Sequence, residues 1–423
     1  ASPDSRASEP DARPLRGQYG MTGLPQGILC RQLLSALIAA MLAFVAPTGS
    51  GALAAEQSTG ADTVAIKAPH AILMDADTGA IMFQRAADEL IYPASMSKLM
   101  TLAVAFKAIK AGEIKLEDEF FMSEYAWRKG GAPSGTSAMM VPVGKKAKLE
   151  ELLKGITVQS GNDAAISIAE NMAGNESLFV KRMNAEARQI GLKKSSFTNP
   201  TGLHDPGHQM TARELAILAR HIIRTYPDLY ELFALKEFNY LKHRFINRNP
   251  LLGQVAGLDG LKTGFTKEAG NGIVASAKQD GRRLIAVVAG DATADERRDD
   301  ARRLLEWGFR AFAETKLFDA GEIVGHARVW GGQRMYVPLS GKGDINVWLP
   351  RNMGNQKLRA NIVYQWPLKP PLKKGDQVAV LRVTTSSETM NEVPLFVAED
   401  VEQAGPMRRG FDSILCLATR WLP

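Results

Sequence analysis

An apolar helix that starts beside a serine and a lysine constrains the fold of this chain more than any other stretch. Its apolar residues recur with the spacing of three and four that places them on one helix face, at Leu99, Leu102, Phe106 and Ile109. We expect this helix to begin near Ser95 and to stop at Gly112, so that Lys98 projects from the same face as Ser95. A neutral lysine amine can take the proton of a serine hydroxyl and make it a nucleophile. The stretch therefore predicts either a reactive serine or an ordinary helix cap, and its companions decide between them.

The two ends of the chain predict export and membrane attachment. An apolar run over residues 33–46, preceded by Arg31 and followed by small residues up to Ala55, is typical of a secretory signal peptide. We assign residues 21–55 to that signal and residues 1–20, which lack a hydrophobic pattern, to an upstream extension without function. Residues 403–423 are predicted to be a linker and an amphipathic helix whose apolar stripe is Phe411, Ile414, Leu415, Ala418, Trp421 and Leu422. The flanking arginines favour a peripheral membrane anchor over docking on the protein's own core.

Two domains are expected between these ends. Over residues 62–315 a strand pair is followed by a helical insert, further strands and a closing helix, a pattern that predicts an α/β (α+β) domain with a mostly antiparallel sheet. One inserted helix opens with Thr211 and Glu214 at the spacing of a capping box. Residues 316–402 are predicted to form a small all-β domain without a catalytic constellation, with strands at 328–330, 335–337, 345–349, 358–364, 378–383 and 393–398.

Charge and composition narrow the classes of partner. The net charge of +7 and the pI of about 9.2 favour an anionic neighbourhood, but Lys and Arg are scattered and no aromatic-lined basic stripe indicates nucleic acid. Of the two cysteines, Cys30 lies inside the predicted signal and leaves Cys416 without an internal disulfide partner. His204 and His208 are separated by a helix-breaking Pro-Gly pair, which favours a loop with solvated histidines over a metal site. No metal or cofactor is expected.

Three short motifs follow one another in the order Ser95-Met96-Ser97-Lys98, Ser160-Gly161-Asn162 and Lys262-Thr263-Gly264. Each motif is weak alone, but the set and its order resemble the Ser-x-x-Lys, Ser-x-Asn and Lys-Thr-Gly set of penicillin-binding proteins and serine β-lactamases. Within that group the sequence closely resembles the low-molecular-mass D-alanyl-D-alanine carboxypeptidases of the peptidase S11 type, through residues 92–98, 159–165, 260–264 and 307–309. The resemblance extends through the β domain to the terminal helix and covers nearly all of the mature chain.

This resemblance implies a penicillin-binding/β-lactamase-like transpeptidase domain with a covalent acyl-enzyme mechanism. The implied reaction removes the terminal D-alanine from peptidoglycan stem pentapeptides, and β-lactams are implied as covalent inhibitors. The implied catalytic residues are Ser95 as nucleophile, Lys98 as base and Ser160 as proton relay toward the leaving amine. For Lys98 to be neutral it needs desolvation and a neighbouring positive charge, which Lys262 could supply.

The resemblance also implies a substrate-binding set, which consists of Asn162, Lys262, Thr263, Gly264, Phe265 and Arg297. Asn162 holds the amide of the acyl chain, and the oxyanion hole uses the backbone N–H groups of Ser95 and Phe265. Phe265 occupies a position where some members have histidine, which leaves the rate of deacylation open. Arg297 is the expected second cation for the terminal carboxylate, with the adjacent Arg298 as the alternative register.

Other functions remain as alternatives. A class A β-lactamase would add a glutamate in a Glu-x-x-Leu-Asn setting, and that pattern is not found between Asn162 and Lys262. The motifs leave a DD-endopeptidase open, and a non-catalytic wall-binding protein is a third alternative that the intact motif residues disfavour. The expected location is the periplasm, with peripheral attachment to the inner membrane through the C-terminal helix.

Overall fold

The computed structural model describes residues 64–353, 357–385 and 390–407. The predicted signal peptide, the upstream extension and the terminal amphipathic helix lie outside these residues. Among the described helices, none has the length and apolar character needed to cross a membrane.

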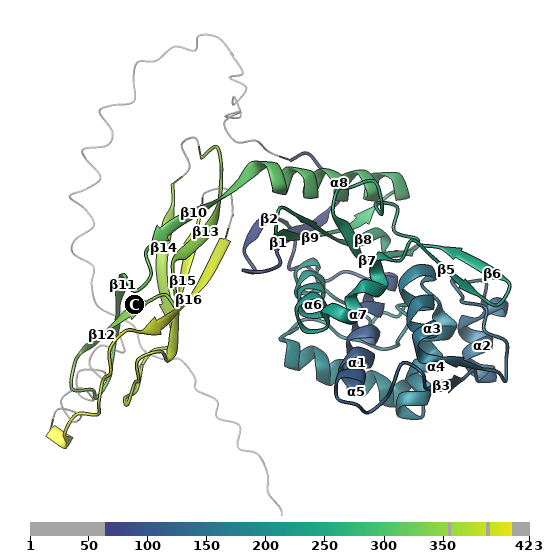
Figure 1. Ribbon diagram of the computed structural model, residues 1–423, viewed down its shortest axis with the longest axis horizontal. Coiled ribbons are helices and arrows are strands. Elements are labelled where there is room, and N and C mark those ends of the chain that lie inside the picture. Colours follow the sequence, from purple (N-terminus) through teal and green to yellow (C-terminus); the bar gives the residue numbers. More distant parts are fainter. Residues whose placement is uncertain (1–63, 354–356, 386–389, 408–423) are drawn as a thin grey trace, which may run out of the picture. The chain divides into compact units, whose positions relative to one another are not determined.

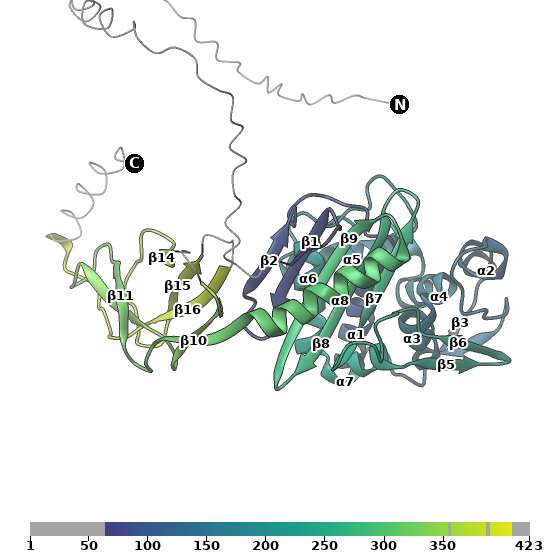
Figure 2. The same ribbon diagram turned by 90° about the horizontal axis from the view of Figure 1, so that it is seen from above.

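The first domain is built on an antiparallel sheet (Figures 1 and 2), as the sequence predicts. Its strands follow the spatial order β2-β1-β9-β8-β7. They are β1 (His70–Asp75), β2 (Ile81–Arg85), β7 (Leu258–Thr266), β8 (Gly270–Gln279) and β9 (Arg282–Asp291). In β8 and β9 the pairing continues beyond the central apolar residues into flanking polar ones, such as Lys278 opposite Arg283.

Both faces of this sheet are buried. In β1 the alternating side chains divide between two clusters, with Ile72 facing the helical insert and Leu73 facing α8 (Ala294–Ala311), which crosses the opposite face (Figure 2). Gly308 lies where α8 crosses the sheet, and a Cβ there would come within 2.4 Å of Leu73 Cδ2. The close approach of helix and sheet therefore leaves no room for a Cβ here unless the ends of the Leu73 and Leu284 side chains shift.

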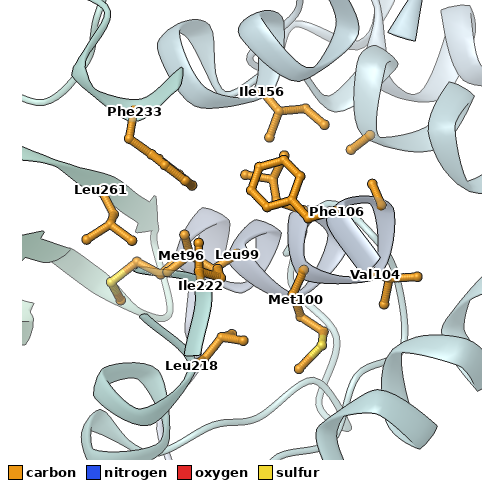
Figure 3. Packing of buried hydrophobic residues seen from close by; sticks show 14 of the residues in the cluster. Met96, Leu99, Met100, Val104, Phe106, Ile156, Leu218, Ile222, Phe233 and Leu261 are labelled. Carbon is orange, nitrogen blue, oxygen red and sulfur yellow. The ribbon is translucent and has the colours of Figure 1, made fainter. Parts of the chain in front are cut away.

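The helical insert surrounds α1 (Lys98–Lys110). Its elements are β3 (Glu119–Phe121), α2 (Glu124–Gly130), β4 (Lys146–Lys148), α3 (Leu149–Lys154), α4 (Asn162–Ala173), α5 (Glu176–Ile190), α6 (Ala212–Thr225), α7 (Pro227–Tyr230), β5 (Glu237–Tyr240) and β6 (His243–Ile246). Figure 3 shows Phe106 beneath Ile156, with Leu218 and Ile222 on another side of α1. The predicted apolar stripe is therefore only part of the buried surface, because every residue from Lys98 to Phe106 is buried.

Two local predictions in the insert are wrong in part. Thr211 caps α6 by accepting the N–H of Glu214 at 3.1 Å, but the reciprocal half of a capping box is absent. The Glu214 carboxylate instead accepts the N–H of Lys194 at 2.8 Å, because that loop packs against the start of α6. His208 is buried and not solvated, since its Nδ1 accepts the N–H of Thr198 at 3.2 Å and its burial lowers its pKa to about 4.

The C-terminal part of the described chain is all-β. Its strands are β10 (Phe312–Phe318), β11 (Ile323–Arg328), β12 (Tyr336–Ser340), β13 (Ile345–Pro350), β14 (Arg359–Tyr364), β15 (Gln377–Thr384) and β16 (Met390–Val397). The strand predicted at 328–330 lies earlier, in β11, whose pairing with β12 ends at Arg328. β10 is not predicted, because it follows α8 without a loop and pairs with β13.

Candidate active site

Ser95 and Lys98 lie side by side where the chain enters α1. A 3₁₀ turn over Ala94–Ser97 precedes the helix, and Lys98 Nζ lies 2.8 Å from Ser95 Oγ. The Lys98 side chain is fully buried and also donates to the carbonyl of Thr201. Burial, followed by the positive charges of Lys262 and Arg248, lowers the pKa of Lys98 well below its usual value. A neutral amine in this position can donate to Thr201 and turn its lone pair toward the serine hydroxyl.

The turn that carries Ser95 packs against a glycine, Gly202. Ala94 has a φ of 47°, and Ser97 Oγ donates to the Ala94 carbonyl at 3.0 Å. Gly202, with a φ of 75°, packs against this turn so closely that a Cβ would lie 2.0 Å from Ala94 O. The segment after α5 therefore supplies both the carbonyl that binds Lys98 and the support for the nucleophile's turn.

Ser160 and Asn162 lie at the junction between two helices. Ser160 adopts a left-handed conformation with a φ of 65°, which ends the helical segment over Gly155–Gln159 before α4 begins at Asn162. Asn162 Nδ2 donates to Thr136 Oγ1 at 2.9 Å. Within the described part of the chain, Ser160 Oγ and Asn162 Oδ1 are buried without a hydrogen-bond partner. Both polar atoms are thus available to a bound molecule.

Asp163 ties a neighbouring segment to the start of α4. Its carboxylate accepts the backbone N–H groups of Met139 at 2.8 Å, Met140 at 3.0 Å and Val141 at 3.3 Å. Burial raises the pKa of Asp163, against the opposing effect of these hydrogen bonds. The three bonds hold the 139–141 segment against the start of α4, where the unpaired Asn162 oxygen lies.

The Lys-Thr-Gly motif forms the middle of β7, beside the Ser95 turn. Lys262 is buried, and its Nζ donates to the Thr263 carbonyl at 3.0 Å. Burial, then the charges of Arg248 and Arg297, lowers the pKa of Lys262 to about 7. A Cβ at Gly264 would lie 2.9 Å from the carbonyl oxygen of Pro93, so this glycine is required by the contact between β7 and the Ser95 turn.

A cavity of about 380 Å³ opens at these motifs. Its lining residues are Ser95, Ser137, Ser160, Arg248, Thr263, Gly264, Phe265 and Arg297. The structure thus brings six of the predicted residues to one cavity, while Lys98, Asn162 and Lys262 are not among its lining residues and are buried. The Phe265 side chain is 62% exposed. No acidic side chain is among the lining residues, so the cavity suits a ligand with a negative group.

Arg248 and Ser137 are the two lining residues that the sequence does not reveal. Arg248 follows β6, and its Nη1 donates to Ser137 Oγ at 2.7 Å. Its backbone N–H also donates to the carbonyl of Val158 at 3.1 Å. The only local signal is a single arginine before Asn249-Pro250. Asn249 does support the loop, since its Nδ2 donates to the Gly260 carbonyl at 3.0 Å.

The two adjacent arginines on α8 have different surroundings. Arg297 lines the cavity, whereas Arg298 forms ion pairs with Asp295 at 2.6 Å and Asp299 at 3.1 Å on the outer side of the helix. The described residues contain no cluster of three or more His, Cys, Asp or Glu side chains arranged to hold a metal ion.

A serine beside a buried lysine, a second unpaired serine and a cationic wall define an acyl-transfer site of the serine type. Residues 55–293 match the peptidase S11 family, described as D-alanyl-D-alanine carboxypeptidase, and residues 312–403 match the C-terminal domain of penicillin-binding protein 5. The chain therefore belongs to the D-alanyl-D-alanine carboxypeptidase family. The predicted family is confirmed, as is a penicillin-binding domain followed by an all-β domain.

Relatives and solved structures agree with this assignment. The chain is similar to the D-alanyl-D-alanine carboxypeptidase DacC of Escherichia coli, with 37% identity over 90% of this chain and 95% of the relative. DacF of Bacillus subtilis is 32% identical over 89% of this chain and 95% of its own length. Penicillin-binding protein 5 from Haemophilus influenzae superposes with a TM-score of 0.67 at 34% identity, covering 81% of this chain and all of that structure. The ampicillin-bound penicillin-binding protein D2 of Listeria monocytogenes gives a TM-score of 0.52 at 28% identity, covering 59% and 99%.

Proposed function

We propose that this protein is a serine-type D-Ala-D-Ala carboxypeptidase that removes the terminal D-alanine from peptidoglycan pentapeptides and is acylated by β-lactams. The observation that carries the proposal is the 2.8 Å contact between Lys98 Nζ and Ser95 Oγ, made by a fully buried lysine with a lowered pKa. A charged lysine would bind the serine oxygen without activating it, whereas a neutral one can accept its proton. The names of the relatives support the same substrate class.

The proposed acylation step transfers one proton and breaks one amide bond. Ser95 Oγ attacks the carbonyl carbon of the penultimate D-alanine while Lys98 takes the hydroxyl proton. The backbone N–H groups of Ser95 and Phe265 bind the oxyanion that forms. Ser160, whose hydroxyl has no partner among the described residues, then accepts this proton from Lys98 and gives its own to the nitrogen of the leaving D-alanine, so that the amide C–N bond breaks and Lys98 is neutral again. A water molecule then hydrolyses the ester on Ser95 and regenerates the free enzyme.

Recognition of the substrate uses the charge of the cavity. The terminal carboxylate lies between Thr263 of β7 and Arg297 of α8, with Lys262 behind it, and all three groups favour an anion at this end. Asn162 holds the amide of the acyl chain through the oxygen that has no partner within the described chain. Arg248 completes the opposite wall, where it also orients Ser137.

This activity is exercised outside the cytoplasm, where peptidoglycan is found. The signal peptide over 21–55, the peptidase domain over 62–315, the β domain over 316–402 and the anchor over 403–423 belong to the same proposal. The relatives are named D-alanyl-D-alanine carboxypeptidases, and a substrate in peptidoglycan supports an extracytoplasmic location. Peripheral attachment to the inner membrane rests on the amphipathic pattern of the terminal segment.

The direct test is release of D-alanine from a soluble pentapeptide, with intact-mass detection of the penicilloyl adduct. Ser95→Ala is expected to abolish both D-alanine release and the adduct. Ser177→Ala is the matched control, because Ser177 is an exposed serine of α5 that does not line the cavity. It is expected to keep the adduct. D-alanine release by the Ser95→Ala protein would show that Ser95 is not the nucleophile.

A further inference from the structure

An acidic side chain lies behind the cationic wall of the cavity. Asp291 ends β9 and pairs with Asn271 of β8, which in turn pairs with Phe265 of β7. Asn271 Nδ2 donates to the backbone carbonyls of Asp291 at 3.2 Å and Ala292 at 3.1 Å, which fixes this end of the sheet. Asp291 therefore occupies the edge of the sheet where α8 begins and where Arg297 reaches the cavity.

The Asp291 carboxylate is buried without a hydrogen-bond donor. The residue is only 2% exposed, and neither carboxylate oxygen accepts an N–H or O–H within the described part of the chain. Buried carboxylates are normally paired or hydrogen-bonded, so this arrangement calls for an explanation. An ionised carboxylate left in this state would be costly, and a protonated one could donate to a neighbouring acid.

The charged groups that face Asp291 come from α8 and consist of Glu296, Arg297 and Asp300. Asp300 Oδ2 accepts the backbone N–H of Ala68 at 2.7 Å, and Glu296 pairs with Lys67 Nζ at 2.8 Å. Asp300 and Glu296 are thus already engaged with the segment before β1. Arg297 is the one cation of this group, and its Nε is buried without a hydrogen-bond partner among the described residues.

We propose that Asp291 is a positioning residue that sets, through its own charge, how strongly Arg297 attracts the terminal carboxylate of the substrate. The proposal rests on the proposed function, because it requires Arg297 to face that carboxylate. A neutral Asp291 leaves the guanidinium charge uncompensated. An ionised Asp291 offsets part of that charge from behind, in a buried setting where screening by water is weak.

The charge of Asp291 is expected to change near neutral pH. Burial, followed by the negative charges of Asp300 and Glu296, raises the pKa of Asp291 to about 7. Below that pH the protonated carboxyl can donate to Asp300 and leaves Arg297 fully attractive. Above it the carboxylate competes with the substrate for the guanidinium. Affinity for the terminal carboxylate is therefore expected to fall as the pH rises through about 7.

The test compares KM and kcat of wild type and Asp291→Asn on a soluble pentapeptide between pH 5.5 and 8.5. Asparagine has the shape of the protonated acid but cannot ionise. The ratio of wild-type to variant KM is expected to be near one at the acidic end and to reach about threefold at the alkaline end, with kcat alike. Titration of Lys262 affects both proteins, so the ratio removes its contribution. Glu306→Gln is the matched control, since it removes an exposed carboxylate from the same helix that is not among the charges acting on Asp291 or Arg297, and it should leave the ratio flat.

Two further variants keep the proposal falsifiable. Asp300→Asn removes an acidic neighbour that raises the pKa of Asp291, so KM is expected to rise at a lower pH than in wild type. This variant tests the proposal even if the Asp291→Asn protein does not fold. Arg297→Gln tests the underlying function, because it should raise KM at every pH. A raised KM for Arg297→Gln with a flat ratio for Asp291→Asn overturns the role of Asp291 alone. An unchanged KM for Arg297→Gln overturns the carboxylate-binding role of Arg297 instead.

Discussion

Removal of the buried Lys262 charge is expected to stabilise the protein while it damages the site. Lys262 is 2% exposed, and its ammonium makes one hydrogen bond, to the Thr263 carbonyl. No carboxylate forms an ion pair with it in the described part of the chain. Burial, aided by the charges of Arg248 and Arg297, lowers its pKa from 10.5 to about 7. Such a difference between folded and unfolded chain is a stability cost.

The size and sign of this cost follow from the two pKa values. The unfolded chain keeps the Lys262 proton up to about pH 10.5, whereas the folded chain loses it near pH 7. The full cost is therefore present below pH 7, shrinks as the pH rises and vanishes above 10.5. A fall of about 3.5 in pKa corresponds to about 5 kcal/mol. We expect Lys262→Met to be more stable than wild type by about 5 kcal/mol at pH 6 and by about 1 kcal/mol at pH 10.

The assay is urea unfolding of both proteins at five pH values from 6 to 10, followed by tryptophan fluorescence. Lys278→Met is the matched control, because Lys278 is an exposed lysine on the neighbouring strand β8. Its substitution should change the free energy of unfolding by the same small amount at every pH. A Lys262→Met gain that is equal at pH 6 and pH 10 would refute the argument from charge burial. Slow acylation by penicillin should accompany the gain in stability.

Two further substitutions test the electrostatics and the packing of the site. Arg248→Gln removes a charge that lowers the pKa of both Lys98 and Lys262. The pH below which the acylation rate falls should therefore move to a higher value. Acylation rates measured from pH 5 to 9 that fall at the same pH as in wild type would contradict this. Gly202→Ala places a Cβ 2.0 Å from Ala94 O and should lower the free energy of unfolding by about 3 kcal/mol or more and prevent adduct formation. Gly253→Ala, at a φ of 80° in open space, should cost only about 1 kcal/mol and leave the adduct intact.

The residues that the sequence revealed are those whose proximity is set by local geometry. Ser95 and Lys98 must be neighbours because they lie three residues apart at a helix start. The strand of Lys262 was visible through the motif Lys262-Thr263-Gly264, which stands directly after Gly260 and Leu261. Arg248 and Ser137 meet across 111 positions of sequence, and no local pattern announces such a contact. Only the tertiary fold brings them to the cavity.

The sequence did not predict the boundary between two elements where no turn residue separates them. The sequence from α8 to β10 contains no glycine or proline between Gly308 and Phe318, so nothing marked the change from helix to strand. The spacing of Glu214 from Thr211 fitted a capping box, but its carboxylate accepts hydrogen bonds from Lys194 N–H and Ser195 Oγ of the loop after α5 instead. A capping pattern in the sequence therefore predicts a hydrogen bond only where no tertiary contact offers the same side chain another partner.

The charges of the site explain why its lysines act as they do. Lys98, Lys262, Arg248 and Arg297 surround one cavity, and the lining contains no acid that could neutralise them. Mutual repulsion and burial together remove the proton that Lys98 would otherwise keep, which is the condition for it to act as a base. The same excess of positive charge attracts a carboxylate, and a bound carboxylate would raise the pKa of Lys262. In the proposed mechanism, substrate binding and activation of the serine both depend on this excess of positive charge. Asp291 of β9 faces Arg297 and, when ionised, can offset part of that charge.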